Sequence, residues 1–410
     1  MSDAMAARYR DLHANPELSM QEHRTAGIVA AALRESGFEV AERVGVTGVV
    51  GLLLNGAGPT VLLRADMDAL PVAEATGLPY ASAARGVDPD GAEQPVMHAC
   101  GHDAHVTCLL AACEVLAADR ASWAGTVLAV FQPGEEVGAG ARAMLDDGIF
   151  ERFGRPDVCL GQHVSPLPAG HLALRSGPTM AASDSFRVRM FGRGGHGSMP
   201  NATVDPVLMA ASTVVRLQGV VAREVAATDA AVVTIGSLHA GTKENIIPDE
   251  ADLKVNIRSY EPDVRTRVLG AVERIISAEA QASGAPRPPE ITTLHTFPVT
   301  VNEPAAAERV RAALAAEFGD DLVHEMPLVP GSEDFGAFGT RAEVPSVFWF
   351  YGGVDLTPEA MAAFARGRPS SDVPSNHSPL FAPVIDPTLA TGARALLAAA
   401  LEWLAPRGAR

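Results

Sequence analysis

Short apolar segments separated by helix-like stretches determine the fold class expected for the first part of the chain. Four such runs span residues 48–54, 60–66, 125–132 and 158–163, and each is followed by polar residues. Runs without polar alternation are typical of strands buried on both faces of a sheet. Helix-like segments at residues 103–118 and 139–145 lie among them. This alternation of strands and helices favours an α/β layer with a largely parallel sheet.

A different pattern begins near residue 181. The segment 186–191 alternates apolar and polar residues, as a half-exposed strand does. The elements predicted after it are helices at 205–220 and 261–283 and strands at 231–238, 251–260 and 291–295. The order β-α-β-β-α-β predicts a small two-layer α+β domain. Because the α/β pattern returns after about residue 298, we predict a discontinuous domain of residues 1–181 and 297–410, into which residues 182–296 are inserted.

Charge and cysteine content exclude several classes of protein. The 410 residues include 32 Lys and Arg against 49 Asp and Glu, a net charge of −17. This charge argues against nucleic-acid or anionic membrane partners, which require clustered positive residues. No apolar window approaches the ~18 residues of a membrane span, and the first residues lack the apolar core of a secretory signal. Three of the four cysteines lie between positions 100 and 113, a poor disulfide framework, so a reduced, cytoplasmic protein is expected.

Residues 97–105 are the densest group of metal-ligand side chains in the sequence. Met97-His-Ala-Cys-Gly-His-Asp-Ala-His105 holds three histidines, a cysteine and an aspartate. Cys100 and His102 come directly before a predicted helix, whose N-terminus favours a thiolate. Thiolate and imidazole are preferred ligands of zinc-like ions, so metal binding is favoured here over core packing. His98 could support a ligand indirectly and His105 could simply pack on the helix.

Pairs of carboxylates follow two of the predicted strands. Asp66 and Asp68 point the same way on an extended segment, although an isolated pair of this kind is more often a solvated turn. Glu135 and Glu136 are adjacent and point apart, so one could bind metal while the other acts as a general base. On their own they could equally be two exposed loop acids. A lone histidine is more often structural, but His163 and His377 add two imidazoles. Since open α/β sheets bind ligands at the carboxyl ends of their strands, the groups together favour one site.

A set of motifs in this order resembles the amidohydrolase branch of the aminoacylase/carboxypeptidase metallopeptidase family. That branch includes hippurate hydrolases, N-acyl-amino-acid amidohydrolases and indole-acetyl-amino-acid hydrolases. The motifs cover nearly the whole chain and are Arg10-Asp-Leu-His-Ala-Asn-Pro-Glu-Leu-Ser, Asp66-Met-Asp-Ala-Leu-Pro, residues 97–105, Gln132-Pro-Gly-Glu-Glu, Gly194-Gly-His-Gly-Ser, Asn245-Ile-Ile-Pro, Gly331-Ser-Glu-Asp-Phe-Gly and Asn376-His-Ser-Pro. The resemblance implies a two-metal catalytic domain with an inserted lid domain that often dimerises.

Carried over by position, the resemblance implies two divalent metal ions, with zinc preferred and manganese, cobalt or nickel as alternatives. The implied ligands are Cys100, His102, Glu136, His163 and His377. Glu135 would be the general base, and Asp68 would orient a ligand. The wider family has a histidine where this chain has Asp66, and the branch with Cys100 lacks it, so Asp66 is not assigned as a ligand.

The resemblance also assigns residues of the inserted domain. His196 would stabilise the oxyanion, often in the neighbouring subunit's site, and Asn245 matches a substrate-contacting position. Arg258 is our own candidate for binding a substrate carboxylate, and it could equally be a surface charge on a strand. Residues 242–245 look less typical of the family and leave the substrate preference open.

The expected function is that of a cytoplasmic, metal-dependent amidohydrolase. It would cleave the amide bond of a small N-acyl amino acid by a metal-activated water, and would form a homodimer through the lid domain. One alternative is a dipeptidase or carboxypeptidase of the same fold. Another is a catalytically silent metal- or ligand-binding homologue, against which the intact Glu135–Glu136 pair and the five candidate ligands argue.

Overall fold

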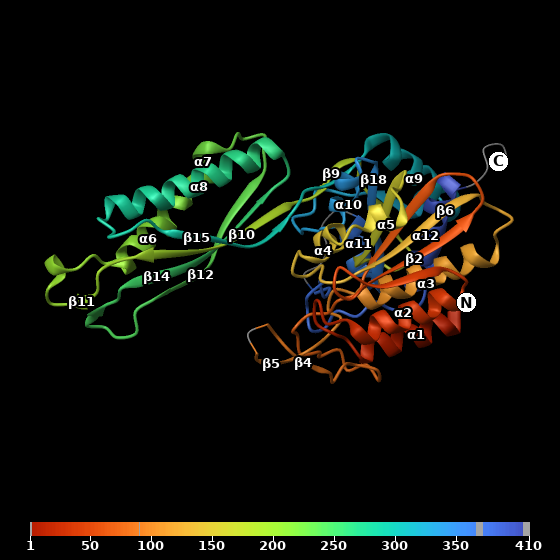
Figure 1. Cartoon of the computed structure of the whole chain (residues 1–410), viewed down its shortest axis with the longest axis horizontal. Coiled ribbons are helices and arrows are strands. Elements are labelled where there is room, and N and C mark those ends of the chain that lie inside the picture. Colours follow the sequence, from red (N-terminus) through yellow and green to blue (C-terminus); the bar gives the residue numbers. More distant parts are fainter. Residues whose placement is uncertain (1, 90, 366–371, 405–410) are drawn as a thin grey trace. The chain divides into compact units, whose positions relative to one another are not determined.

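The computed structural model describes residues 2–89, 91–365 and 372–404, and the chain divides into two compact units (Figure 1). The first unit consists of Met1–Thr179, Val301–Pro327 and Asp334–Arg410. The second unit consists of Met180–Thr300 and Leu328–Glu333. The chain passes between the units within β9 (Gly177–Met180), within β16 (Thr300–Asn302) and on both sides of the short segment Leu328–Glu333. The segment predicted as an insertion, residues 182–296, lies inside the second unit.

An eight-stranded mixed sheet forms the centre of the first unit. Its order is β1 (Glu39–Val44), β2 (Gly48–Asn55), β6 (Gly125–Gln132), β3 (Thr60–Asp66), β7 (Val158–Pro168), β18 (Ser346–Val354), β8 (Leu172–Leu174) and β17 (Val323–Glu325). The four strands β6, β3, β7 and β18 are parallel to one another, whereas β1 and β2 pair antiparallel. The apolar runs of the sequence form the buried strands of this sheet, which is the mixed, largely parallel sheet expected.

The helices of the first unit come from all parts of the chain. They are α1 (Ser2–Ala14), α2 (His23–Glu35), α3 (His102–Ala118), α4 (Gly140–Asp146), α5 (Ile149–Phe153), α9 (Pro304–Phe318), α10 (Gly336–Ala342), α11 (Pro358–Ala365) and α12 (Thr388–Leu404). The central helix α3 packs against α1, α2, α12 and the strands β3 and β7. It is buried on all sides from His102 to Cys113, because its sequence has no polar face.

The second unit is a two-layer α+β domain, as the order of its elements predicted. Its antiparallel sheet has the order β12 (Ala231–Ala240), β14 (Glu250–Ser259), β10 (Ala182–Phe191) and β15 (Glu290–Phe297). The helices α6 (Pro206–Leu217), α7 (Gly219–Glu224) and α8 (Pro262–Ala282) pack on this sheet (Figure 1). Alternate residues of β14 are buried, among them Leu253, Val255 and Ile257, and they form one core with side chains of α6 and α8.

Two further observations bear on the setting of the protein. Among the residues that the structure describes, no helix is long and apolar enough to cross a membrane. All four cysteines are free and buried, and three of them, Cys108, Cys113 and Cys159, are fully enclosed. They behave as small core residues of α3 and β7.

Candidate metal centre

The parallel strands of the first unit bring the polar clusters of the sequence to one edge of the sheet. In the ladder between β3 and β6, Asp66 is paired with Gln132, so the segments that follow leave the sheet side by side. The backbone N–H of Glu136 donates to Asp68 Oδ2 at 3.0 Å. The neighbouring strand β7 carries His163, and it continues beyond this residue to Pro168.

The five side chains predicted as metal ligands form one cluster in the first unit. Atoms of Cys100, His102 and Glu136 that could ligate a metal all lie within 4.8 Å of one another. Cys100 Sγ is 3.4 Å from His163 Nε2. His377 Nε2 is 3.3 Å from Glu136 Oε2. Thiolate, imidazole and carboxylate donors from four separate segments of the chain therefore meet at one place, as in a protein metal site.

Two buried polar atoms in this cluster have no hydrogen-bond partner among the described residues. They are His102 Nε2 and Glu136 Oε1, which lie 3.8 Å apart. A buried polar atom without a partner costs free energy, so such a pair points to a group that binds between them. The other nitrogen, His102 Nδ1, lies 3.2 Å from Asp68 Oδ1. Since Asp68 also accepts from the Ser19 hydroxyl at 2.7 Å, it holds the imidazole with Nε2 turned toward the cluster.

Negative charge accumulates at this cluster. Burial, together with the Glu136 carboxylate, raises the pKa of the Cys100 thiol well above its usual value. Burial lowers the pKa of His102, but the carboxylates of Asp66 and Asp68 outweigh it and raise this pKa to about 10. A thiolate at Cys100 therefore requires a compensating positive charge, which a divalent cation provides.

His163 has the protonation state of a ligand. Burial, aided by the neighbouring His105, lowers the pKa of His163 well below its usual value, so the ring is neutral. Its Nδ1 donates to the carbonyl oxygen of Val164 at 2.6 Å, which leaves a lone pair on Nε2 facing Cys100.

The turns that carry Cys100 and His377 are fixed by the backbone. Gly101 has φ +87°, and a Cβ at this position would lie 2.3 Å from Cγ1 of Val164, so only glycine fits between Cys100 and His102. The His377 N–H donates to the carbonyl oxygen of Ala99 at 2.8 Å. The loop before α12 is thereby tied to the Cys100 turn.

A second set of potential ligand atoms lies nearby. These atoms are within 4.8 Å of one another and come from Asp66, His102, His105 and His163. Here, however, His105 uses both ring nitrogens: Nδ1 donates to Asp66 Oδ1 at 2.5 Å, and Nε2 accepts from the Val164 N–H at 2.8 Å. Asp66 Oδ2 accepts from Arg64 at 2.6 Å. Both residues are therefore occupied by protein partners, which fits the omission of Asp66 from the predicted ligands.

Glu135 and Glu136 both lie beside the candidate ligands. Glu136 approaches His102 and His377. Glu135 is also buried, and it lies close enough to Cys100 for its charge to help raise the pKa of the thiol. Glu136 thus lies close to the imidazoles and to the thiol, while Glu135 is near enough to the thiol for its charge to act on it.

Sequence reasoning missed Ser19, which donates to the carboxylate of Asp68, and Arg64, which donates to that of Asp66. Arg64 is fully buried within β3 and binds Gln132, Asp66 and Asp334. An arginine inside an apolar run is a signal that could have predicted a buried carboxylate nearby, because a buried charge requires a buried partner.

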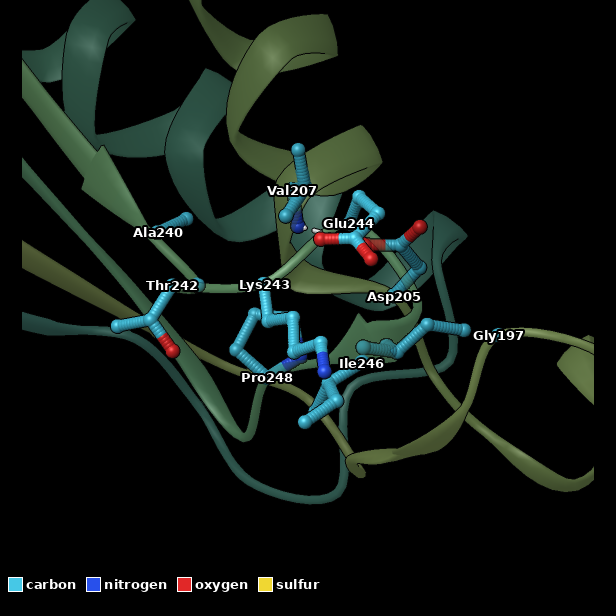
Figure 2. Close-up of a pocket in the computed structure, with 11 residues that line it drawn as sticks. Gly197, Asp205, Val207, Ala240, Thr242, Lys243, Glu244, Ile246 and Pro248 are labelled. Atoms are coloured by element: carbon cyan, nitrogen blue, oxygen red, sulfur yellow. Dashed lines mark hydrogen bonds between the residues drawn. The ribbon is translucent and has the colours of Figure 1, made fainter.

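The predicted residues of the inserted domain lie in the second unit. The ladder between β11 (Gly195–His196) and β13 (Ile246–Ile247) brings His196 and Asn245 close together, and the Gly197 N–H donates to the Asn245 carbonyl at 2.9 Å. His196 is exposed. The adjoining loop borders a pocket of about 410 Å³ near the start of α6, and Figure 2 shows Lys243 and Glu244 among the residues that line it.

Arg258 on β14 is engaged within its own unit. Its guanidinium donates to the carbonyl oxygen of Pro330 at 2.6 Å and to the Ser332 hydroxyl at 3.1 Å. It also donates to Asn256 Oδ1 at 3.1 Å. A substrate carboxylate at Arg258 would compete with these contacts.

Comparison with known proteins identifies close relatives. Residues 62–363 match the model of the peptidase family M20/M25/M40. The chain is 41% identical to a hippurate hydrolase of Campylobacter jejuni, over 80% of this chain and 82% of the relative. It is 38% identical to thermostable carboxypeptidase 2 of Saccharolobus solfataricus, over 84% of each chain. A crystal structure of the Bacillus subtilis YXEP protein, a dinuclear metal binding peptidase from the M20 family, matches with a TM-score of 0.75 and 29% identity over 98% of both chains.

Proposed function

The chain belongs to the peptidase family M20/M25/M40, and we propose that it is a metal-dependent amidohydrolase that cleaves N-acyl amino acids. The observation that carries this proposal is the cluster of Cys100, His102 and Glu136. Two buried atoms of this cluster, His102 Nε2 and Glu136 Oε1, have no hydrogen-bond partner among the described residues. The relative named hippurate hydrolase supports the substrate class.

The donor set fits two divalent cations. We assign them the ligands predicted from the sequence: Cys100, His102, Glu136, His163 and His377. Zinc is the preferred metal because thiolate and imidazole donors suit it, with manganese, cobalt or nickel as alternatives. When bound, the cations supply Lewis acidity that activates a water molecule and polarises the scissile carbonyl.

The remaining roles fall to side chains of the protein. Asp68 is a positioning residue that keeps His102 turned toward the cluster. Glu135 takes the proton of the attacking water and delivers it to the leaving amine. His196 donates a hydrogen bond to the developing oxyanion, and Asn245, beside it, contacts the substrate. Arg258 is the candidate residue for binding the substrate carboxylate. To do so, its guanidinium would have to give up its hydrogen bonds to Pro330 and Ser332.

The function is tested by measuring hydrolysis of a panel of N-acyl amino acids and dipeptides after reconstitution with each candidate metal. We expect metal-dependent release of the free amino acid from N-acyl substrates, with benzoyl- and acetyl-amino acids compared first. Preference for peptides would instead favour the carboxypeptidase alternative, which the relative from Saccharolobus solfataricus represents. Stoichiometric metal binding without turnover of any substrate would favour the silent homologue.

The proposed setting is a homodimer, formed through the second unit, in the cytoplasm. Leu208 and Val215 lie two turns apart on α6, with 67% and 74% of their surfaces exposed. β12 is an edge strand of the neighbouring sheet and exposes Val232. Exposed apolar side chains beside an open edge are typical of interfaces.

The four free cysteines fit the reducing environment of the proposed cytoplasmic location.

Cys100→Ser is expected to weaken metal binding and to remove most of the activity, because a serine hydroxyl is a poor substitute for a thiolate ligand. Cys108→Ser, Cys113→Ser and Cys159→Ser are the matched controls, and they should retain metal and activity since these thiols lie in the apolar core. Metal content by elemental analysis and turnover provide the readout. Unchanged metal stoichiometry in Cys100→Ser would eliminate the thiolate ligand.

A further inference from the structure

A second group of buried ionisable side chains lies beside the first turn of α3. His13 of α1 stands between two carboxylates, with Nδ1 2.6 Å from Asp103 Oδ2 and Nε2 3.1 Å from Glu74 Oε1. All three side chains are completely buried. None of them belongs to the candidate metal ligands, although Asp103 directly follows His102 in the sequence.

The contacts of His13 require both ring nitrogens to donate. Burial alone lowers the pKa of His13, but the carboxylates of Asp103 and Glu74 outweigh it and raise this pKa to about 10. The carboxylates are themselves fixed: Glu74 Oε2 accepts from the Ser82 N–H at 2.5 Å, and Asp103 Oδ1 accepts from the Ala104 N–H at 2.9 Å. The three side chains therefore form a rigid link from α1 and the loop after β3 to the start of α3.

Polar contacts help to set the rotation of α3 about its axis. The helix is buried on every side and has no polar face, so no amphipathic pattern marks one of its faces as the inner one. Directional hydrogen bonds therefore add to the packing of its side chains in fixing one orientation. In the first turn these bonds join His102 to Asp68, His105 to Asp66 and Asp103 to His13.

We propose that His13 is a positioning residue for the metal cluster: by holding Asp103, it fixes the first turn of α3 so that His102 Nε2 faces Cys100 and Glu136. The inference rests on the ligand set of the proposed function, because it gives His102 a ligand's role. Successive side chains of a helix are about 100° apart, so a rotation that releases Asp103 also turns His102 away from the cluster.

The test compares His13→Gln with Tyr9→Phe. Tyr9 lies one turn earlier on α1, is also completely buried, and donates one hydrogen bond to the Pro383 carbonyl at 2.9 Å. Both variants lose buried hydrogen bonds, so both are expected to lower Tm. Only His13→Gln is expected to bind Co²⁺ and Zn²⁺ more weakly, by about 10–100-fold in chelator competition, as for other residues that orient a ligand. Its Co²⁺ absorption spectrum should change, and saturating metal should restore most of kcat.

Wild-type metal affinity and an unchanged Co²⁺ spectrum in His13→Gln would overturn the inference and leave His13 a purely structural role. If His13→Gln does not fold, Glu74→Gln provides the test, because it removes the charge on the side of His13 away from α3 and keeps an acceptor oxygen. It should weaken metal binding to a smaller extent, and wild-type affinity would again overturn the inference. Failure of the proposed function is distinguishable, since wild-type protein would then bind metal without hydrolysing any substrate of the panel.

Discussion

Glu135→Gln is expected to lower kcat by at least about 10²-fold, the low end of the loss expected for a missing general base, while metal content stays near that of the wild type. Glutamine keeps the size of the side chain but cannot take a proton from the attacking water. The assigned ligand Glu136 remains in place, 3.3 Å from His377 and 3.8 Å from His102. The measurements are kcat on the best substrate of the panel and metal content by elemental analysis.

Glu136→Gln is the matched control, because it makes the same chemical change one residue along the chain. It is expected to show the reverse pattern, with reduced metal content as the primary defect. Full activity in Glu135→Gln would remove Glu135 from the mechanism. Loss of metal in Glu135→Gln, with retention in Glu136→Gln, would show that the two carboxylates have exchanged roles.

The fold could be predicted where local pattern and tertiary environment agree. The runs at 60–66 and 125–132 form β3 and β6 because strands covered on both faces need continuous apolar sequence. The three-residue strands β8 and β17 have no such signal, since a strand this short depends on its partners. β1 (Glu39–Val44) was also missed, because it lies at the edge of the sheet, three of its six residues are charged and only Val44 is buried.

The site was predictable in its residue types but not in its contacts. Three histidines within residues 98–105 look alike in sequence, yet His105 is engaged at both nitrogens by Asp66 and the Val164 backbone. These partners are separated from it by 39 and 59 positions, so no local pattern reveals them. The same holds for His13, whose partner Asp103 is 90 positions away. Long-range pairing decides which imidazole keeps a free lone pair.

His196→Ala is expected to lower kcat by roughly 10²–10³-fold, the loss typical of one oxyanion donor, with metal content intact. The local geometry supports a donor role. His196 Nδ1 accepts from the Ser198 N–H at 3.1 Å, so the proton of the neutral ring resides on Nε2. His196 is the exposed last residue of β11, with glycines on both sides at 195 and 197. His239→Ala is the control, because it removes another exposed histidine of the same unit and should leave kcat unchanged. Normal turnover by His196→Ala would exclude the catalytic role.

Mixing His196→Ala protomers with Glu135→Gln protomers tests whether the imidazole acts in the partner's site. Each variant alone lacks one group in every site. If His196 acts across the interface, a hybrid dimer contains one site that has both the wild-type base and the wild-type donor, so activity should recover toward half of the wild-type value per dimer. If His196 acts within its own chain, each site of the hybrid lacks either the base or the donor, and activity should stay at the level of the separate variants. Hybrids verified by differential tagging that remain inactive would therefore exclude donation across subunits and place the donor in its own chain.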